Sequence, residues 1–477
     1  MLGQIREKYQ MMFTGLSRRV ARGLMAVMAV VIAASALVSG MRPALSQGLP
    51  LIRDSEIEAL LNDYAQPIFR ASGLGSGRIT MRIVRNDAFN AFVVDGGNVF
   101  VHTGLLMQSD TPNQVIGVIA HEAGHIAGGH MAALRHRIAK DQTRALLLQI
   151  LAAGLMAGGI AAGDRDVTAA GGAGLSSGPN FVIRSLLAER RSQESAADQF
   201  GLRVLDATKQ SGRGMLETFE RFAQQEYISD TYKDPFARSH PVATDRLNQL
   251  RRAVEGSRYY ANFDSPQLQL RHDLMRAKLS GYLESPAIVL NRYPMTDKSL
   301  PARYARGIAR YFQGGRDGLQ AALAEIDQLV NERPDYAYFW EVKGDLLMRS
   351  GKSVEAIPFL RKAISLAGKK NDTLMQVQLA TALQNTGQKA SVGESIKLLK
   401  ASLIEDPNPR AYRLLAAAYY NQGDRPKADA MTAQAYYFEG NIDQAQIFAK
   451  RAQRALKAGS PEWIKNEDII KYEPPRG

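Results

Sequence analysis

Cysteine is absent from all 477 residues of this chain. No disulfide can therefore support the fold, and no thiol chemistry is available. The sequence also lacks a basic cluster with interleaved aromatic residues, which argues against a nucleic-acid partner despite a formal net charge of +13. Removal of residues 1–46, which hold six basic residues and one acidic residue, would leave a charge of +8. That charge permits peripheral contact with acidic lipid headgroups or acidic protein surfaces.

Long apolar runs are few, and the first of them predicts export. Three arginines between positions 18 and 22 precede the apolar run Leu24 to Val38, and a small-x-small cleavage site at 44–46 follows it. The run is shorter than the roughly twenty residues that span a membrane. Residues 1–46 are therefore interpreted as a signal peptide, and a chain without cysteine suits the oxidising periplasm. A membrane-anchored protein is the alternative.

Histidine is scarce as well, with seven residues in the chain, yet an HExxH pentad occupies residues 121–125. Such a pentad arises by chance in on the order of one such chain in a hundred or fewer. Thr111 and Gln114 match a helix capping box, and Pro112 falls at the first helical position. The pentad therefore lies well inside a helix.

Two histidines four apart lie on one face of a helix, so His121 and His125 can reach a single zinc ion. Glu122 projects where it can polarise the attacking water. A third ligand is expected from Glu194, with the fourth position open, and Asp198 is expected to accept the free N–H of a ligand histidine. E-x-x-x-D alone usually marks a solvated acidic face, but apolar neighbours favour a buried helix here. The pattern predicts a peptidase with one Zn²⁺ per chain.

This arrangement resembles the gluzincin metallopeptidases of the Oma and HtpX type, in which an HExxH helix is followed by a glutamate ligand in an E-x-x-x-D helix. All five residues of that pattern match here. The resemblance implies an α+β zincin-type domain that hydrolyses proteins or peptides. Residues 90–106 resemble that family's hairpin and consist of two β-runs around Asp95-Gly96-Gly97. In such enzymes the second run is expected to be an edge strand to which an extended peptide adds.

Three other histidines, His240, His130 and His136, are candidates for a place near the zinc. His240 lies in a Ser239-His240-Pro241 segment. The resemblance implies that this histidine lies near the zinc, where it either occupies the open coordination position or stabilises the oxyanion, whereas spacing alone indicates a loop histidine. His130 lies about 140° around a continuing helix from His125. It and His136 are predicted not to be ligands.

A second apolar stretch, Ala145 to Gly163, is interrupted only by Gln149 and is followed by a Gly/Ser-rich segment. Its length would just allow a membrane span. A single membrane crossing there, however, would place His125 and Glu194 on opposite sides of the membrane, where they could not bind the same metal ion. Residues 145–180 are therefore predicted to form a buried or membrane-surface hairpin that acts as a lid, with an interfacial or re-entrant segment as the alternative.

Helical repeats are predicted beyond residue 264. Gly351, Gly387 and Gly423 are spaced 36 residues apart in polar turns, and the residue seven positions before each is small. This resembles the tetratricopeptide repeat. A plain helical bundle is the alternative.

The sequence thus predicts an α+β zinc-metallopeptidase domain at 47–255, an all-α tetratricopeptide-repeat solenoid at 264–465 and a tail at 466–477. The resemblance implies a periplasmic endopeptidase with a chaperone-like role in outer-membrane protein assembly and quality control. Its repeats would dock the assembly machinery or its substrates. A non-catalytic assembly factor and a membrane-anchored quality-control protease are the alternatives.

Overall fold

The computed structural model describes residues 49–75, 79–94, 97–134, 136–137, 140, 189–223, 234–315, 317–368 and 371–474. The predicted signal peptide at 1–46 and the predicted lid segment at 145–180 lie outside these residues. Within the described part of the chain, no helix is both long and apolar enough to cross a membrane.

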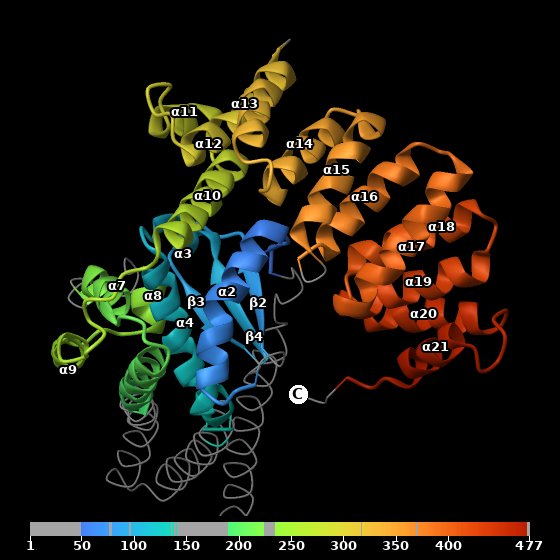
Figure 1. Ribbon diagram of the computed structural model, residues 1–477. Helices are drawn as coiled ribbons and strands as arrows, with labels where there is room; N and C mark the ends of the chain where they lie inside the picture. Colours follow the sequence, from blue (N-terminus) through green and yellow to red (C-terminus); the bar gives the residue numbers. More distant parts are fainter. Residues whose placement is uncertain are drawn as a thin grey trace, which may run out of the picture.

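A four-stranded sheet lies in the N-terminal half of the molecule (Figure 1). Its strands, in spatial order, are β1 (Leu51–Ile52), β2 (Thr80–Val84), β4 (Asn98–His102) and β3 (Ala91–Val93). β2 and β4 are parallel, while β3 and β1 pair antiparallel to their neighbours. The structure confirms the two predicted β-runs. However, the expected edge position of the second run is wrong, because β4 is hydrogen-bonded to strands on both sides and β3, not β4, is an edge strand of the described sheet.

The helices that pack on the sheet begin at side-chain caps. Asp54 accepts the N–H groups of the second and third residues of α2 (Ser55–Ala71). Thr111 caps α4 (Pro112–Ala127), and Pro112 occupies its first turn, as predicted. The HExxH pentad therefore lies inside a helix that starts nine residues before it.

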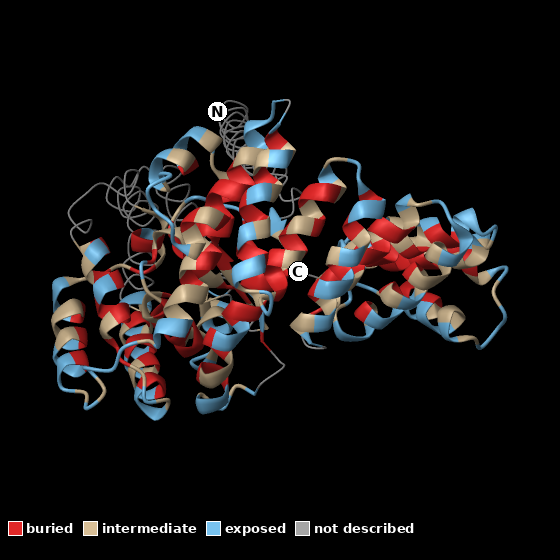
Figure 2. Cartoon of the chain, turned by 45° about the horizontal axis from the view of Figure 1, so that its top comes forward, coloured by how far each residue is buried: buried red, intermediate tan, exposed pale blue. Residues whose placement is uncertain are grey.

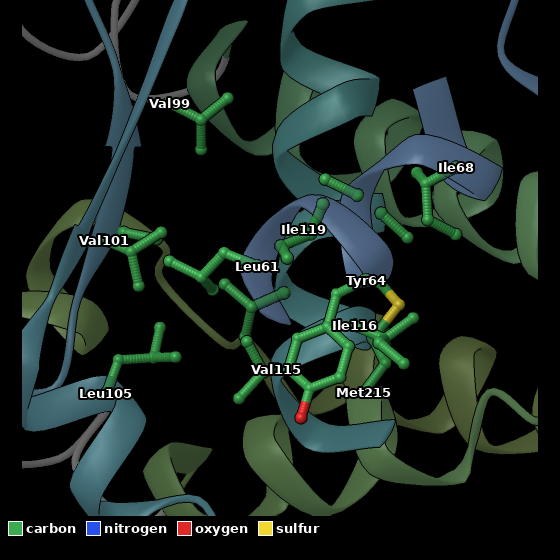
Figure 3. Close-up of a cluster of buried hydrophobic side chains, with 14 of the residues drawn as sticks. Leu61, Tyr64, Ile68, Val99, Val101, Leu105, Val115, Ile116, Ile119 and Met215 are labelled. Atoms are coloured by element: carbon green, nitrogen blue, oxygen red, sulfur yellow. The ribbon is translucent and has the colours of Figure 1, made fainter. Parts of the chain in front are cut away.

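The core fills the space between these two helices and the sheet (Figure 3). Leu61 and Tyr64 of α2 lie beside Ile116 and Ile119 of α4, and Val101 of β4 completes the layer. All five are almost fully buried. The remaining elements of this half are α3 (Thr103–Gln108), a helix over 189–207, α7 (Arg213–Ala223), α8 (Pro235–Ser239) and α9 (Thr244–Glu255).

The C-terminal half is an elongated array of helices packed side by side in chain order (Figure 1). Its members are α10 (Pro266–Leu283), α11 (Pro286–Arg292), α12 (Leu300–Gln313), α13 (Gly318–Glu332), α14 (Ala337–Arg349), α15 (Ser353–Ala367), α16 (Thr373–Asn385), α17 (Lys389–Glu405), α18 (Pro409–Asn421), α19 (Arg425–Phe438), α20 (Ile442–Gln453) and α21 (Pro461–Lys471). Buried residues follow the inner faces of these helices (Figure 2).

The repeated glycines occupy the predicted turns of this array. Gly351, Gly387 and Gly423 each have positive φ in a turn between two helices, a conformation that glycine adopts without steric cost. The small residue seven positions before Gly351 also has a packing reason, because a Cβ on Gly344 would lie 2.5 Å from Leu360 Cδ2. Assignment of these helix pairs as tetratricopeptide repeats stays a prediction.

Helix α10 belongs to both halves of the molecule. Met275 and Leu279 lie in the core formed with α2 and α4, whereas Leu274 and Ala277 lie in the first core of the array. Residues beyond 264 therefore complete the N-terminal core, and the division near 255–264 stays a prediction. At the far end, α21 continues through the position expected to separate the array from the tail.

A buried ion cluster reinforces this junction. Lys278 of α10 lies 2.8 Å from Asp54, 3.3 Å from Glu56 and 3.3 Å from Glu341 of α14. The hydroxyl of Tyr304 donates to Glu56 at 2.9 Å. Burial raises the pKa of Glu341 to about 7, against the lowering effect of Lys278. The start of α2 is thus linked electrostatically to three helices of the array.

Candidate metal centre

Two helices cross at very short range beneath the site. A Cβ on Gly124 of α4 would lie 2.7 Å from the Cα of Ala197, which belongs to the helix 189–207. On the same interface, a Cβ on Gly201 would lie 3.1 Å from the carbonyl carbon of Ala120. Because neither glycine carries a side chain, the two backbones can approach closely. This crossing brings the pentad within reach of the acidic residues on the second helix.

The structure brings together His121, His125, Glu194 and His240, whose donor atoms all lie within 4.8 Å of one another. His121 Nε2 lies 3.1 Å from His125 Nε2 and 3.3 Å from Glu194 Oε2, and His125 Nε2 lies 3.4 Å from Glu194 Oε1. His240 directs Nδ1 into the same space, 3.0 Å from His121 Nε2 and 3.1 Å from Glu194 Oε2. Side chains from three segments distant in sequence therefore converge on one point.

This donor set fits a metal ion of the zinc type. Zinc binds imidazole nitrogen and carboxylate oxygen at about 2.0–2.2 Å, usually with tetrahedral geometry, which separates neighbouring ligand atoms by about 3.3 Å. The five separations between donor atoms given above, 3.0 to 3.4 Å, match that spacing. Imidazole nitrogens that face one another at this range also need a proton or a cation between them.

Asp198 and Arg246 support the donors from behind. Asp198 Oδ1 lies 2.9 Å from Nδ1 of His121, which is the contact that the sequence predicts for Asp198. Arg246 of α9 donates to both oxygens of Asp198, at 2.5 and 2.8 Å, and its Nη1 lies 3.2 Å from Glu194. One guanidinium therefore pairs with two buried carboxylates.

Sequence reasoning assigned no role to Arg246. Its side chain is 7% exposed and also donates to the carbonyl of Pro241, next to His240, at 2.8 Å. An electrostatic signal could have found it. In the metal-free chain, two carboxylates buried four residues apart need a buried cation, because an uncompensated buried charge is costly.

Glu122 adjoins the donor set. It is 1% exposed, and its Oε1 lies 3.4 Å from Nε2 of His240. Within the described residues, neither of these two atoms has a hydrogen-bond partner. Burial raises the pKa of Glu122. A buried carboxylate in this position can accept a proton from a molecule that enters the site.

The charges around the donor set favour a cation at this point. Burial and the neighbouring His121 lower the pKa of His125 to about 2. Burial opposes ionisation of Glu194, yet His240 and His121 hold its pKa well below the usual value. Burial also lowers the pKa of His121, but Asp198 and Glu194 outweigh that effect and raise the pKa to about 9. The carboxylates that attract a proton to His121 attract a metal cation in the same way.

His130 and His136, predicted not to be ligands, lie outside the four-residue donor set. The reasoning for His130 assumed a continuing helix, which is wrong, because α4 ends at Ala127 and the chain turns at 128–129. The turn brings His130 back against α4, where its Nδ1 lies 3.0 Å from Nδ1 of His125. His136 is exposed.

Comparison with known proteins agrees with this geometry. The model of peptidase family M48 matches residues 52–254. The β-barrel assembly-enhancing protease of Yersinia pestis is 26% identical over 431 residues, which are 87% of this chain and 82% of that protein. The protein of the same name from Escherichia coli K12 is 25% identical over 432 residues, with coverages of 86% and 82%. Metalloprotease LoiP of Escherichia coli K12 is 29% identical over 163 residues, 34% of this chain and 57% of its own length.

Among solved structures, one titled MamA MSR-1 C2 aligns with 37% of this chain and 99% of its own, at 22% identity and a TM-score of 0.30, a likeness too low to support an argument.

The matched family region begins in β1 and ends in α9, so it contains the whole donor set and Glu122. Residues 52–254 therefore form a peptidase family M48 domain, and this chain is a metallopeptidase.

Proposed function

We propose that this chain is a zinc-dependent endopeptidase. The observation that carries the proposal is the convergence of His121, His125 and Glu194 beside a buried Glu122. These three ligands would hold one zinc ion per chain, with Asp198 orienting His121. When bound, zinc supplies a Lewis acid that polarises the scissile carbonyl and lowers the pKa of water. Glu122 takes the proton of the attacking water and delivers it to the leaving amine.

An extended peptide substrate would bind along the edge strand β3. The outer side of β3 is unpaired within the described sheet, and main-chain pairing there would hold a peptide in an extended conformation. Asn90, just before β3, has its Oδ1 3.2 Å from the hydroxyl of Ser239. The edge strand therefore adjoins the loop that carries His240, which supports passage of the substrate next to the donor set.

His240 would control access to the metal. Its Nδ1 faces the other donors at 3.0–3.1 Å, which supports a role as fourth ligand at rest. Under this gating role, His240→Ala frees the position and raises basal proteolysis. Under the alternative, oxyanion stabilisation, the same change lowers turnover and leaves zinc content unchanged. A variant with unchanged activity and unchanged metal spectroscopy would exclude both roles.

The proposed site of action is the periplasm, reached through the signal peptide at 1–46. Relatives named for β-barrel assembly support a role in outer-membrane protein assembly and quality control. The array at 264–465, as a tetratricopeptide-repeat solenoid, would recruit the assembly machinery or its substrates, and the positive charge permits peripheral membrane contact. Extraction of membranes at alkaline pH would distinguish this protein from a membrane-anchored protease, which stays in the membrane.

Elemental analysis and one substitution test the catalytic proposal. The purified chain should carry about one zinc per molecule, and His121→Ala with His125→Ala should remove it. Glu122→Gln should keep the zinc and lower proteolysis by about 10²- to 10⁴-fold, because the carboxylate acts as a base. Glu255→Gln, at an exposed glutamate of α9, is the control. Full cleavage by Glu122→Gln would favour a non-catalytic assembly factor.

A further inference from the structure

The two pentad histidines differ in what contacts the nitrogen that faces away from the donor set. His121 Nδ1 contacts the carboxylate of Asp198, at 2.9 Å. His125 Nδ1 contacts a third imidazole instead, that of His130, at 3.0 Å. The His125 and His130 rings are nearly perpendicular, with an interplanar angle of 81° and centroids 5.0 Å apart.

The turn after α4 is built around the His130 ring. A Cβ on Gly128 would lie 2.2 Å from Nε2 of His130, so any side chain at that position would occupy the space of the imidazole. Gly129 has a φ of +62°, which reverses the chain after α4. The N–H of Ala133 then donates to the Gly129 carbonyl and starts the next helical turn with His130. Two glycines thus place a histidine against His125.

We propose that His130 is a positioning residue for His125, with the His125 Nδ1–H donating to His130 Nδ1. This inference rests on the proposed zinc site. A histidine that binds metal through Nε2 must carry its proton on Nδ1, and a partner for that proton fixes both the tautomer and the ring orientation. A neutral His130 accepts through Nδ1 and keeps its own proton on Nε2. It therefore does for His125 what Asp198 does for His121.

Zinc affinity of the full chain, measured by competition with a chelator, tests this inference. His130→Ala should weaken zinc binding by about 10- to 100-fold, the usual effect of removing the partner of a ligand histidine. His136→Ala, at an exposed histidine six residues later, should leave the affinity unchanged. Gly128→Ala should weaken binding in the same direction, because its methyl group displaces the ring. In the His130→Ala background, Gly128→Ala should add no further loss.

A spectroscopic measurement separates positioning from a general effect on the fold. Cobalt-substituted His130→Ala should show a changed visible absorption spectrum, while thermal unfolding of its metal-free form should match that of His136→Ala. Equal zinc affinity of His130→Ala and wild type, an equal loss in His136→Ala, or a loss from Gly128→Ala that persists without His130 would each overturn the inference. A wild-type chain that binds no zinc would overturn the proposed function itself, and the inference with it.

Discussion

The helical array is built from contacts between residues close in sequence, whereas the metal centre is built from contacts between residues far apart in sequence. In the array, Gly344 packs against Leu360 of the next helix, and the same spacing of small residues and turn glycines recurs along the chain. In the metal centre, His121 meets Asp198 across 77 residues and His240 across 119. A periodic sequence pattern can report the first kind of contact, whereas the second kind appears only when distant segments pack.

The two regions also differ in what they bury. The centre buries six groups that can carry charge, His121, Glu122, Glu194, Asp198, His240 and Arg246, within one cluster. The array buries mainly apolar and small residues. The buried ion cluster around Lys278 lies at the junction between the array and the N-terminal half. Substitutions in the centre should therefore unpair charges, while most substitutions in the array should change only packing.

The largest effect is expected from Arg246→Met. This change leaves Asp198 and Glu194 buried without their cation, so the free energy of unfolding of the metal-free chain should fall by about 3–5 kcal/mol. Denaturant unfolding measures it. The matched control is Arg252→Met on the same helix, where the arginine is exposed, and its cost should stay within about 0.5 kcal/mol. Equal costs at the two positions would contradict the comparison.

A pH-dependent effect is expected at the junction. Because the pKa of Glu341 is raised from 4.5 to about 7, the folded chain holds a proton there that the unfolded chain has lost. The free energy of unfolding is therefore highest, as far as this group is concerned, below pH 4.5. It falls as the pH rises toward 7, by up to about 3 kcal/mol. Glu341→Gln should remove that decline. Urea unfolding at pH 5 and pH 7.5 measures it, with exposed Glu355→Gln as the control.

A smaller effect is expected from adding one methyl group to each region. At Gly124 the new Cβ meets the Ala197 backbone, which cannot move aside, so Gly124→Ala should cost about 1–3 kcal/mol and weaken zinc binding. At Gly344 the Cβ meets Cδ2 and Cγ of the buried Leu360 side chain, which can shift more readily than a backbone can. Gly344→Ala should therefore cost less and leave zinc affinity unchanged. Weakened zinc binding in Gly344→Ala would show that the two regions are not independent.

Local patterns were the most reliable predictors. The helix around the pentad, its Thr111 cap and Pro112 at its first turn depend on neighbouring residues, and the structure contains all three. The turn glycines of the array were equally predictable, because positive φ is a local property. Patterns failed where the outcome depends on the order of strands in the sheet or on where a helix ends. The first case is the edge strand, and the second is His130, which lies beyond the end of α4.

By itself, the sequence determined which residue types were available for chemistry: two histidines and a glutamate on one helical face, and an acidic pair four residues apart on another helix. Tertiary structure alone decided that these faces meet, that Arg246 pairs with both carboxylates, and that His130 turns back onto His125. The physical reason is that a helix determines only its own periodicity. Which helices cross, and how closely, depends on distant glycines such as Gly124 and Gly201 and on the core that packs around them.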